Sequence, residues 1–373
     1  MAGAKMSSSS QTSGRCLPVE EWPVFDRIRW EEAFEATDIL SANAVTARWS
    51  ARSRYKTEKG YGRWLDWNLQ RAGSIPGISP TARVTRERVA AYVGDLQAVN
   101  SSHTVQTRIQ ELADAMRVLA PDKDWRWLTA VGLRLRQQAR SIRNKMARMQ
   151  SPELLEALGL KLMTDADSDV SWPILRRATC YRDGLMIALL SRRPLRLKNL
   201  VALTIGRQLV VGETGYALIY TAAEMKNRQP YEIAIPAGLS GQLERYLTYW
   251  RRILLTRGSR QSAFATDALW ISREGTPIGE QSVYHRIVKL TRKAFGQPVN
   301  PHLFRDCAAT TVAIAAPEQV HDVPALLGHK DPSTANHYYN QARALDAGRR
   351  YSGIIDRYRQ VARNSRYSKG SAS

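Results

Sequence analysis

The residues that could do chemistry gather between positions 302 and 338. His302 and Arg305 stand three apart in an HxxR motif, His329 ends a Leu-Gly-His triplet, and a tyrosine follows nine residues later, at 338 (338 − 329). A guanidinium and two imidazoles can surround a phosphate and stabilise its charge, and a phenol beside them can act as a nucleophile. The types and the spacing of these residues therefore predict an electrostatic clamp for a phosphate, with Tyr338 as the attacking group.

Short helices are expected to position these side chains. Asn300, followed by a proline, has the pattern of a helix N-cap and first turn, so His302 and Arg305 should lie on one face of a helix that starts there. The positive end of such a helix, with its free backbone N–H groups, is a natural seat for a phosphate. Asp331, again followed by a proline, repeats the signal and places Tyr338 about two turns into a second short helix.

The balance of charge favours a polyanionic partner. The chain of 373 residues has 55 basic and 34 acidic side chains, a net charge of +21, and arginine dominates the basic set. Nucleic acid is the default partner for such a surplus, because the planar guanidinium suits bidentate phosphate contacts; a generally basic soluble protein is the plainer interpretation. The three cysteines, at positions 16, 180 and 307, form neither a disulfide framework nor a metal-binding pair, which indicates a reducing cytosol. The sequence shows neither a signal-peptide core nor an apolar run of about 20 residues, so membrane insertion is not expected.

Two cations upstream extend the pattern. Arg196 lies in the run Arg-Pro-Leu-Arg-Leu-Lys-Asn-Leu that ends at residue 200, and Lys226 lies in a polar turn between two strand-like runs. Together with the HxxR motif, the Leu-Gly-His triplet and the tyrosine, these positions resemble the active site of the tyrosine recombinases, the phage integrase family. The resemblance covers roughly residues 170 to 345, and its six candidate residues occur in the family's order. They are Arg196, Lys226, His302, Arg305, His329 and Tyr338.

The resemblance implies a covalent route for breaking DNA. Tyr338 would attack a phosphodiester and become linked to the 3′ phosphate, which conserves the bond energy until a deoxyribose hydroxyl attacks the phosphotyrosine. Arg196 and Arg305 would clamp the non-bridging oxygens. Because these cations can stabilise the transition state by themselves, and no tight cluster of Asp and Glu is visible, we expect neither a metal nor a cofactor.

The three remaining candidates would move protons and hold the phosphate. By the same resemblance, Lys226 would protonate the departing 5′ oxygen, His302 would assist proton transfer, and His329 would hydrogen-bond the phosphate or pack beside Tyr338. Each residue alone has a more ordinary interpretation, as a core tyrosine, a surface ion pair, a helix cap or a polar turn residue. The combination is far more specific than any one of its members.

Three positions bear on this interpretation. Pro194 stands where the family usually has glycine, and Asn199 stands where it usually has an acidic residue. Asn199 has no negative charge with which to orient Arg196, so that role is lost or moved. Tyr339 is an alternative nucleophile, but one helical step of about 100° would point it away from the direction of Tyr338, so the spacing favours Tyr338.

The composition divides the chain into five segments. Residues 1–20 are rich in Ser and are expected to be disordered, residues 21–145 to form a helical module, and residues 146–151 to form a linker. Residues 152–345 would form the catalytic domain and residues 346–373 a basic C-terminal tail. In the family, such a helical module grips one side of the DNA while the catalytic domain closes over the other side.

Apolar spacing predicts the helices of the module. Residues 55–69 repeat aromatic and apolar side chains at steps of three and four, a pattern more typical of a core-facing stripe than of a base-stacking surface. Further helices are expected after Thr85, as N-cap, and from about Ser102. The basic stretch 141–150, which includes most of the linker, would be either a strap along the DNA backbone or a solvated hinge.

The catalytic region shows a mixed pattern. A strongly apolar helix over residues 174–190 should end before Pro194, and alternating runs then predict a hairpin and a third strand. Strands are expected at 209–211, 216–220 and 231–235, and later helices at 239–255, at 279–295, around His302, at Leu326 and around Tyr338.

We therefore expect a mainly α fold with a small antiparallel β-sheet: a helical N-terminal DNA-binding domain and a mixed α/β catalytic domain of the integrase type. The expected function is site-specific DNA recombination during integration, excision or transposition of a mobile element. The partners would be double-stranded DNA with paired recombination sites and three further copies of the chain in a homotetramer, in the cytoplasm at the nucleoid. Accessory DNA-bending proteins are further candidate partners. The alternatives are a type IB topoisomerase or telomere resolvase, and a non-catalytic DNA-binding regulator on the same scaffold.

Overall fold

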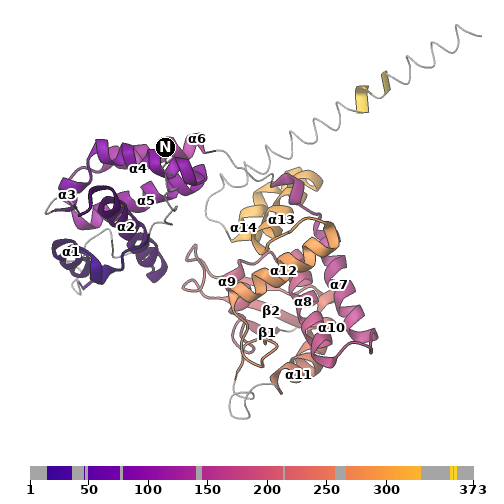
Figure 1. Ribbon diagram of the computed structural model, residues 1–373. Coiled ribbons are helices and arrows are strands. Elements are labelled where there is room, and N and C mark those ends of the chain that lie inside the picture. Colours follow the sequence, from indigo (N-terminus) through magenta and orange to yellow (C-terminus); the bar gives the residue numbers. More distant parts are fainter. Residues whose placement is uncertain are drawn as a thin grey trace, which may run out of the picture. The chain divides into compact units, whose positions relative to one another are not determined.

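The chain forms two compact units, Met1–Asn144 and Lys145–Ser373 (Figure 1). The computed structural model describes residues 15–35, 46, 49–75, 79–139, 145–212, 215–256, 266–328, 353–355 and 357–358. Among these residues, no helix combines the length and the apolar character needed to cross a membrane.

The described part of the first unit is helical (Figure 1). A short 3-10 helix, Val19–Glu21, precedes its α-helices. These are α1 (Val24–Glu35), α2 (Ala51–Ala72), α3 (Pro80–Arg83), α4 (Arg86–Val99), α5 (Ser102–Leu119) and α6 (Arg126–Gln138).

Helix α2 carries the aromatic stripe that the sequence pattern predicted. Tyr61, Trp64 and Leu65 are completely buried, so the centre of the stripe is core. The two ends of the stripe are not, since Tyr55 is 60% exposed and Leu69 is 37% exposed. The stripe is longer than the surface that it covers because a 22-residue helix extends beyond its packing partners.

The caps of the following helices agree with the sequence. The Thr85 hydroxyl accepts a hydrogen bond from the backbone N–H of Arg88, as expected of the N-cap of α4. Helix α5 begins at Ser102, and its cap is the preceding Ser101. These hydroxyls satisfy backbone donors that the first helical turn leaves unpaired.

The described chain includes residues for which we expected disorder. We predicted disorder for residues 1–20, but the described chain starts at Arg15, and Leu17 is buried. The Leu17 N–H donates to the Gly62 carbonyl (3.3 Å), and the Trp22 indole donates to the Leu17 carbonyl (3.1 Å). Gly62 permits this approach because it has no side chain where the Leu17 carbonyl lies. The composition of this segment does not indicate these contacts, because they involve a single leucine, one glycine and one tryptophan.

The second unit combines helices with a small sheet, which confirms the predicted fold class (Figure 1). Its helices up to the sheet are the 3-10 helix Met146–Arg148, α7 (Pro152–Ser168), α8 (Ile174–Arg192) and α9 (Leu197–Val201). After the sheet come α10 (Ala237–Arg245), a π-helical turn (Tyr246–Trp250), α11 (Arg251–Leu255), α12 (Glu280–Phe295), α13 (Pro301–Ala315), the 3-10 helix Pro317–Asp322 and α14 (Val323–Leu327).

The sheet has three antiparallel strands in the order β1-β2-β3. The strands are β1 (Leu209–Gly212), β2 (Gly215–Tyr220) and β3 (Tyr231–Ala234). Leu209 pairs with Leu218, and Leu218 pairs with Ile233, so one apolar row crosses all three strands. The predicted hairpin and third strand are both present.

Helix α7 was not predicted as a separate element. It packs along α8 where Gly159 and Gly184 face one another, and a Cβ on either glycine would collide with the backbone of the other helix. Its cap is Ser151, whose hydroxyl accepts from the Leu154 N–H (3.3 Å). Glycine and alanine supply the close contact there, and neither local sequence indicates it.

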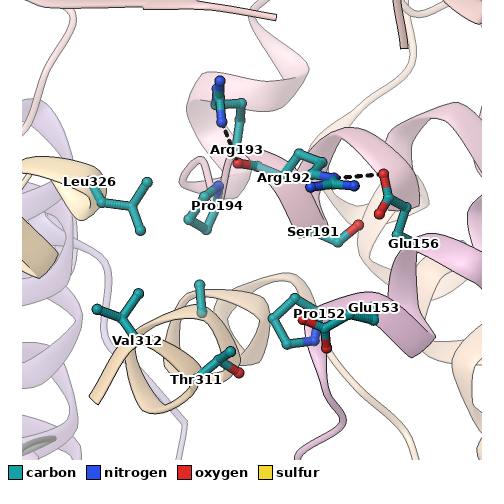
Figure 2. Close-up of a pocket in the computed structure, with 11 residues that line it drawn as sticks. Pro152, Glu153, Glu156, Ser191, Arg192, Arg193, Pro194, Thr311, Val312 and Leu326 are labelled. Carbon is teal, nitrogen blue, oxygen red and sulfur yellow. Dashed lines mark hydrogen bonds and ion pairs between the residues drawn. The ribbon is translucent and has the colours of Figure 1, made fainter. Parts of the chain in front are cut away.

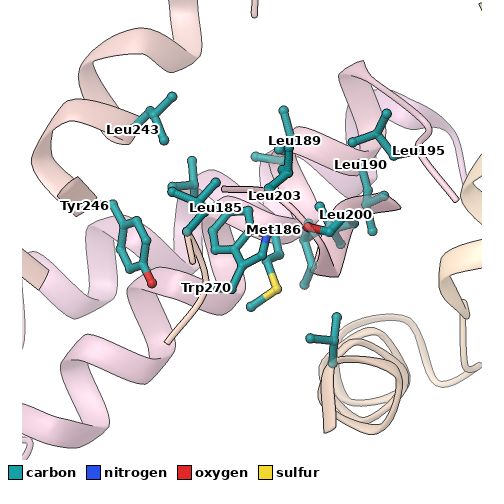
Figure 3. Packing of buried hydrophobic residues seen from close by; sticks show 14 of the residues in the cluster. Leu185, Met186, Leu189, Leu190, Leu195, Leu200, Leu203, Leu243, Tyr246 and Trp270 are labelled. Atoms are coloured by element: carbon teal, nitrogen blue, oxygen red, sulfur yellow. Dashed lines mark hydrogen bonds between the residues drawn. The ribbon is translucent and has the colours of Figure 1, made fainter. Parts of the chain in front are cut away.

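The core of the second unit surrounds α8 and holds the Arg196 segment in place (Figure 3). Leu189 and Leu190 of α8 pack in the same cluster as Leu195 and Leu200, which flank Arg196 in the chain. Each fully buried leucine contributes roughly 1.5–3 kcal/mol relative to an exposed one. The two leucines therefore fix the backbone on both sides of Arg196.

The expected linker is anchored to the second unit instead of being solvated along its whole length. The Arg148 guanidinium donates two hydrogen bonds to the Pro298 carbonyl (3.0 and 2.8 Å), and Met149 packs against the core. The predicted boundaries, 146–151 for the linker and 145 for the end of the helical module, thus fall within a segment that belongs to the second unit. The polar composition of this stretch gave no sign of these partners, because they lie about 150 residues away along the chain.

Candidate active site

Helix α13 begins as the sequence predicts. The Asn300 side chain accepts a hydrogen bond from the Leu303 N–H (3.0 Å), and Pro301 occupies the first turn. The fixed φ of proline suits this position, where its missing N–H costs no helical hydrogen bond. His302 and Arg305 therefore lie in the first turns of a helix of 15 residues.

Arg305 joins three segments of the second unit. Its side chain is deeply buried, and the residue is only 4% exposed. Its guanidinium donates from Nη1 to the Pro194 carbonyl and from Nη2 to the Leu327 carbonyl, both at 2.6 Å. Arg305 thus holds the segment before Arg196 and the end of α14 against helix α13.

Arg196 approaches the same place from the other side. It stands at the N-cap of α9, and its Nη2 donates to the Gly328 carbonyl (3.1 Å). Its Nη1 is buried and has no hydrogen-bond partner within the described part of the chain. Burial also lowers the pKa of this guanidinium below its usual value. A buried donor without a partner costs about 1–3 kcal/mol, so an anionic oxygen is well suited to this position.

Gly328 is the residue of the Leu-Gly-His triplet that contacts Arg196. It ends α14 in the left-handed region, with φ of 56°, where a side chain would be strained. A Cβ there would lie 3.1 Å from Met225 Cε and 3.9 Å from Arg196 Nη1. The glycine therefore serves two purposes, since it terminates the helix and leaves room for Met225.

Lys226 occupies an exposed turn between β2 and β3, as the sequence predicts. The Arg228 N–H closes the turn on the Met225 carbonyl (3.0 Å). Met225 itself is buried, and its Sδ accepts from the Asn199 side-chain amide (2.9 Å). The base of the turn is therefore fixed beside Gly328 and Asn199, while the Lys226 ammonium remains in solvent.

His302 stands at the exposed edge of the cluster. The protein packed around the ring lowers the pKa of its imidazole below the usual 6.5, chiefly by removing water. The Asp306 carboxylate acts in the opposite direction, and the positive charges of Arg305, Lys145 and Arg196 add to the lowering. His302 therefore shares an electrostatic environment with both arginines and is neutral at neutral pH.

The two departures from the family pattern have structural explanations. Pro194 contributes its carbonyl to Arg305, and a carbonyl is available from any residue type. Asn199 donates its amide to Met225 and accepts the Tyr220 hydroxyl on its carbonyl (3.1 Å). Asn199 thus supports the turn that carries Lys226, and the Gly328 carbonyl holds Arg196.

The structure brings four of the six predicted residues into one region of the second unit: Arg196, Lys226, His302 and Arg305. His329 and Tyr338, like the alternative nucleophile Tyr339, lie outside the described residues, so their roles remain predictions. Sequence reasoning missed the supporting residues Met225 and Asp306. The only available signal was their position next to Lys226 and Arg305, and adjacency alone does not distinguish a supporting residue from a surface one.

A cavity of about 250 Å³ lies close to the cluster but is separate from it (Figure 2). Pro194 and Leu326 line one side and Thr311 and Val312 another, and the Arg192–Glu156 ion pair (2.6 Å) lies at its edge. The four described candidate residues are not in its lining. The arginine cluster, not this cavity, is therefore the candidate reaction centre.

The arrangement suits a phosphate better than a metal ion. Two guanidiniums are oriented by backbone carbonyls, which fix their direction without neutralising their charge. Within the ranges that the structure describes, no group of three or more His, Cys, Asp or Glu side chains is placed to hold a metal ion. Fixed cations of this kind stabilise charge that develops on phosphoryl oxygens.

Comparisons with known proteins agree with this geometry. Residues 161–344 match the model of the phage integrase family. No curated protein sequence matches the chain. Among solved structures, the XerH site-specific recombinase bound to its difH substrate, a pre-cleavage complex, is similar over 80% of this chain and 79% of its own, with 14% identity and a TM-score of 0.54. A post-cleavage complex of XerH with a palindromic difH substrate matches over 89% of this chain and 98% of its own, with 13% identity and a TM-score of 0.52.

Proposed function

The chain belongs to the phage integrase family through residues 161–344, and we propose that it is a site-specific DNA recombinase that acts through Tyr338. The observation that carries the proposal is a pair of arginines, the buried Arg305 and the half-buried Arg196, which donate to the adjacent carbonyls of Leu327 and Gly328. The buried Nη1 of Arg196, which has no described partner, supports the placement of a phosphate oxygen there.

In the first step, the Tyr338 oxygen attacks the phosphorus of the scissile phosphodiester. A bond forms between the tyrosine and the 3′ phosphate, and the bond from phosphorus to the 5′ oxygen breaks. Arg196 and Arg305 stabilise the charge on the non-bridging oxygens during this step. The energy of the broken bond is kept in the phosphotyrosine, so that rejoining needs no external energy source.

Proton transfers accompany both steps. The neutral imidazole of His302 accepts the phenol proton, and Lys226, on its exposed turn, donates a proton to the departing 5′ oxygen. His329 hydrogen-bonds the phosphate or packs beside Tyr338. In rejoining, a 5′ hydroxyl attacks the phosphotyrosine, the phenol leaves, and the proton transfers reverse.

Recombination requires this cycle on two duplexes. We infer paired sites in double-stranded DNA, a homotetramer that exchanges strands through a junction, and a role with a mobile element at the nucleoid in the cytoplasm. The helical module would contact one side of the duplex while the second unit contacts the other. The net charge of +21 supports a large phosphate-contacting surface.

The test is covalent trapping of DNA. Protein is incubated with a library of nicked duplexes of randomised sequence in the presence of a chelator, and DNA that survives SDS on the protein is sequenced. We expect an adduct that does not need magnesium and a shared sequence among the trapped duplexes. Tyr338→Phe should abolish the adduct and keep DNA binding, because the change removes one hydroxyl.

Tyr339→Phe is the matched control, since it removes the same group from the neighbouring residue. An adduct that persists in Tyr338→Phe and disappears in Tyr339→Phe would move the nucleophile to Tyr339. If both variants still form the adduct, neither tyrosine is the nucleophile. With the trapped site in hand, relaxation or hairpin formation of one duplex without exchange between two would favour a topoisomerase or a telomere resolvase. Binding without any adduct would indicate a regulator.

A further inference from the structure

Residues at the start of the second unit contact helix α13 in a way that the proposed reaction does not use. The Lys145 ammonium pairs with the Asp306 carboxylate (2.6 Å). Three residues later, Arg148 donates to the carbonyl of Pro298, which precedes α13. Met149 packs against the core of the same unit. We call Lys145, Arg148 and Met149 the junction anchor, because they directly follow the last residue of the first unit.

The carboxylate that Lys145 meets has a particular place in the helix. Asp306 follows Arg305 and stands four residues after His302, one helical turn further along the same face. Its side chain is only 3% exposed, whereas that of Lys145 is 52% exposed. A buried carboxylate is costly without a cationic partner, and an ammonium that reaches it from the surface provides one. In this pair, Lys145 is accessible from solvent, whereas Asp306 is buried beside the candidate active site.

We propose that Lys145 is a positioning residue for the reaction: through Asp306 it fixes the first turns of α13, and so sets both the place and the charge environment of His302. This inference rests on the proposed function, because His302 matters only if it handles a proton. It concerns a contact within the second unit, at the point where the chain enters from the first unit.

The charges around His302 support the coupling. Lys145, Arg305 and Arg196 each lower the pKa of the imidazole, and Asp306 raises it. Removal of the Lys145 charge takes away one positive neighbour and leaves the Asp306 carboxylate less compensated, so both effects raise the pKa of His302. Removal of the Asp306 charge acts in the opposite direction. The opposite signs distinguish an electrostatic role from a general loss of packing.

Through this coupling, the position of the junction anchor can affect the rate of cleavage. A displacement of the chain at Lys145 is transmitted to Asp306, and from there to His302 and Arg305 on the same helix. A shift of about 1 Å in a catalytic group can cost about a hundredfold in rate. The entry point of the second unit can therefore influence cleavage without itself touching DNA.

The test compares Lys145→Met, Lys145→Arg and Asp306→Asn in the full chain. Lys161→Met is the matched control, because Lys161 forms an exposed ion pair with Asp165 (2.8 Å) in α7 of the same unit. Two quantities are measured: the pKa of His302 by NMR titration, with its signal assigned through His302→Gln, and the pH dependence of single-turnover cleavage of the trapped site.

We expect Lys145→Met to raise the pKa of His302 and Asp306→Asn to lower it, with the acid limb of the cleavage profile moving in the same direction. At neutral pH, Lys145→Met should cleave roughly tenfold more slowly, a smaller effect than the about hundredfold loss from full misplacement. Lys145→Arg should restore most of the rate, and Lys161→Met should match the wild type in both measurements.

Several outcomes would overturn the inference. An unchanged pKa of His302 in Lys145→Met, or a shift in the same direction in Asp306→Asn, would remove the electrostatic coupling. A rate loss that Lys161→Met reproduces would show that the effect is not specific to the junction anchor. If the wild type forms no covalent adduct, the proposed function fails, but the NMR titration still decides whether Lys145 and Asp306 control His302. If Lys145→Met does not fold, Lys145→Gln takes its place, because glutamine keeps a polar side chain of similar length without the charge.

Discussion

The two arginines of the candidate active site donate to backbone carbonyls. Arg305 donates to Pro194 and Leu327, and Arg196 donates to Gly328. A carboxylate partner would orient a guanidinium equally well but would cancel its charge. Carbonyl partners leave the positive charge available to a phosphate, and this explains why the family's usual acidic residue can be Asn199 here.

The first prediction concerns Arg196. Arg196→Ala should reduce single-turnover cleavage by about 10²- to 10³-fold, because one fixed donor to the developing charge is lost. DNA affinity should change little, since many basic residues share it. Arg192→Ala is the control, because Arg192 is an exposed arginine in an ion pair with Glu156. Cleavage by Arg196→Ala within about tenfold of the wild type, a difference near 1.4 kcal/mol, would exclude it from the site.

The second prediction concerns pH. The pKa of His302 is lowered, so the neutral ring that can accept a proton persists below the usual titration point of 6.5. The rate of cleavage should therefore stay level as the pH falls through 6.5 and decline only when it passes the lowered pKa. The measurement is a pH profile of single-turnover cleavage, with His302→Gln as the variant that lacks the titrating group. A decline centred above 6.5, or the same acid limb in His302→Gln, would contradict this role.

The candidate residues could be predicted from the sequence, but what supports them could not. Arg196, Lys226, His302 and Arg305 carry their chemistry in their side-chain types and lie in recognisable motifs. The Lys145–Asp306 pair joins residues 161 positions apart (306 − 145), and nothing in either local sequence indicates the other. The same is true of Asn199 and Met225, whose contact depends on how a turn folds back on α9.

At the scale of elements, short structures with clear ends position the site. Helix α13 starts at an Asn-Pro cap, and α14 ends at Gly328, so each places its functional groups at a helix terminus. The Leu327 carbonyl that holds Arg305 is available because the last turn of a helix leaves its carbonyls without intrahelical partners. The ends of these helices, more than their faces, determine the geometry of the site.

The third prediction concerns Gly328. Gly328→Ala should lower the free energy of unfolding by about 1 kcal/mol, the cost of a left-handed residue with a side chain. It should also slow cleavage, because the new Cβ would lie 3.1 Å from Met225 Cε, at the base of the turn that carries Lys226. Gly296→Ala is a matched control, since Gly296 has φ of 71° and open space around it. Equal cleavage rates in the two variants would show that the close approach of residue 328 to Met225 does not matter.

Helices and strands were predicted correctly where the apolar periodicity was strong or where a cap, glycine or proline marked the end of the element. The apolar run of α8, the hairpin with its flanking glycines and the capped α13 were all predicted from local pattern. Helix α7 was missed although its buried residues Leu155, Met163 and Ala166 follow a helical spacing; its close contact with α8 through Gly159 and Gly184 could not be predicted from either local sequence. Residues 15–20 were also mispredicted, because Leu17 is held by a contact with Gly62 of α2 in addition to its contact with Trp22.

At the scale of the whole molecule, the chain consists of two units with separate cores. The described chain stops at residue 139 in the first unit and resumes at Lys145 in the second. The junction anchor shows that the described part of the basic stretch 141–150, from Lys145 onward, is fixed to the second unit.

The fourth prediction concerns limited proteolysis. Trypsin should cut free protein after Arg143 well before Arg148, because the Arg148 guanidinium is engaged with Pro298 and the neighbouring Met149 is packed in the core. Cognate DNA should suppress the cut if both units hold the same duplex, since the tether makes the second contact intramolecular. The sites are identified by mass spectrometry of the early fragments. Primary cleavage after Arg148, or no effect of DNA, would contradict this description.

The fifth prediction concerns salt. Binding to any duplex should weaken steeply as salt rises, because arginine and lysine release counterions condensed on the phosphates. A plot of log K against log[salt], measured with a non-specific duplex, should have a slope of several units. A flat plot would argue against an extended phosphate-binding surface despite the net charge of +21.

In the proposed reaction, the chain length between Gly328, whose carbonyl accepts from Arg196, and Tyr338 limits how far the nucleophile can travel. Tyr338 lies ten positions after Gly328 (338 − 328), so its Cα can lie no more than about 36 Å from the Cα of Gly328, even on a fully extended chain. A tether of this length holds its end group at an effective concentration in roughly the millimolar range. In the proposed reaction, the guanidinium of Arg196 would therefore both hold the phosphate and contact the anchor of the segment that carries the proposed nucleophile, Tyr338.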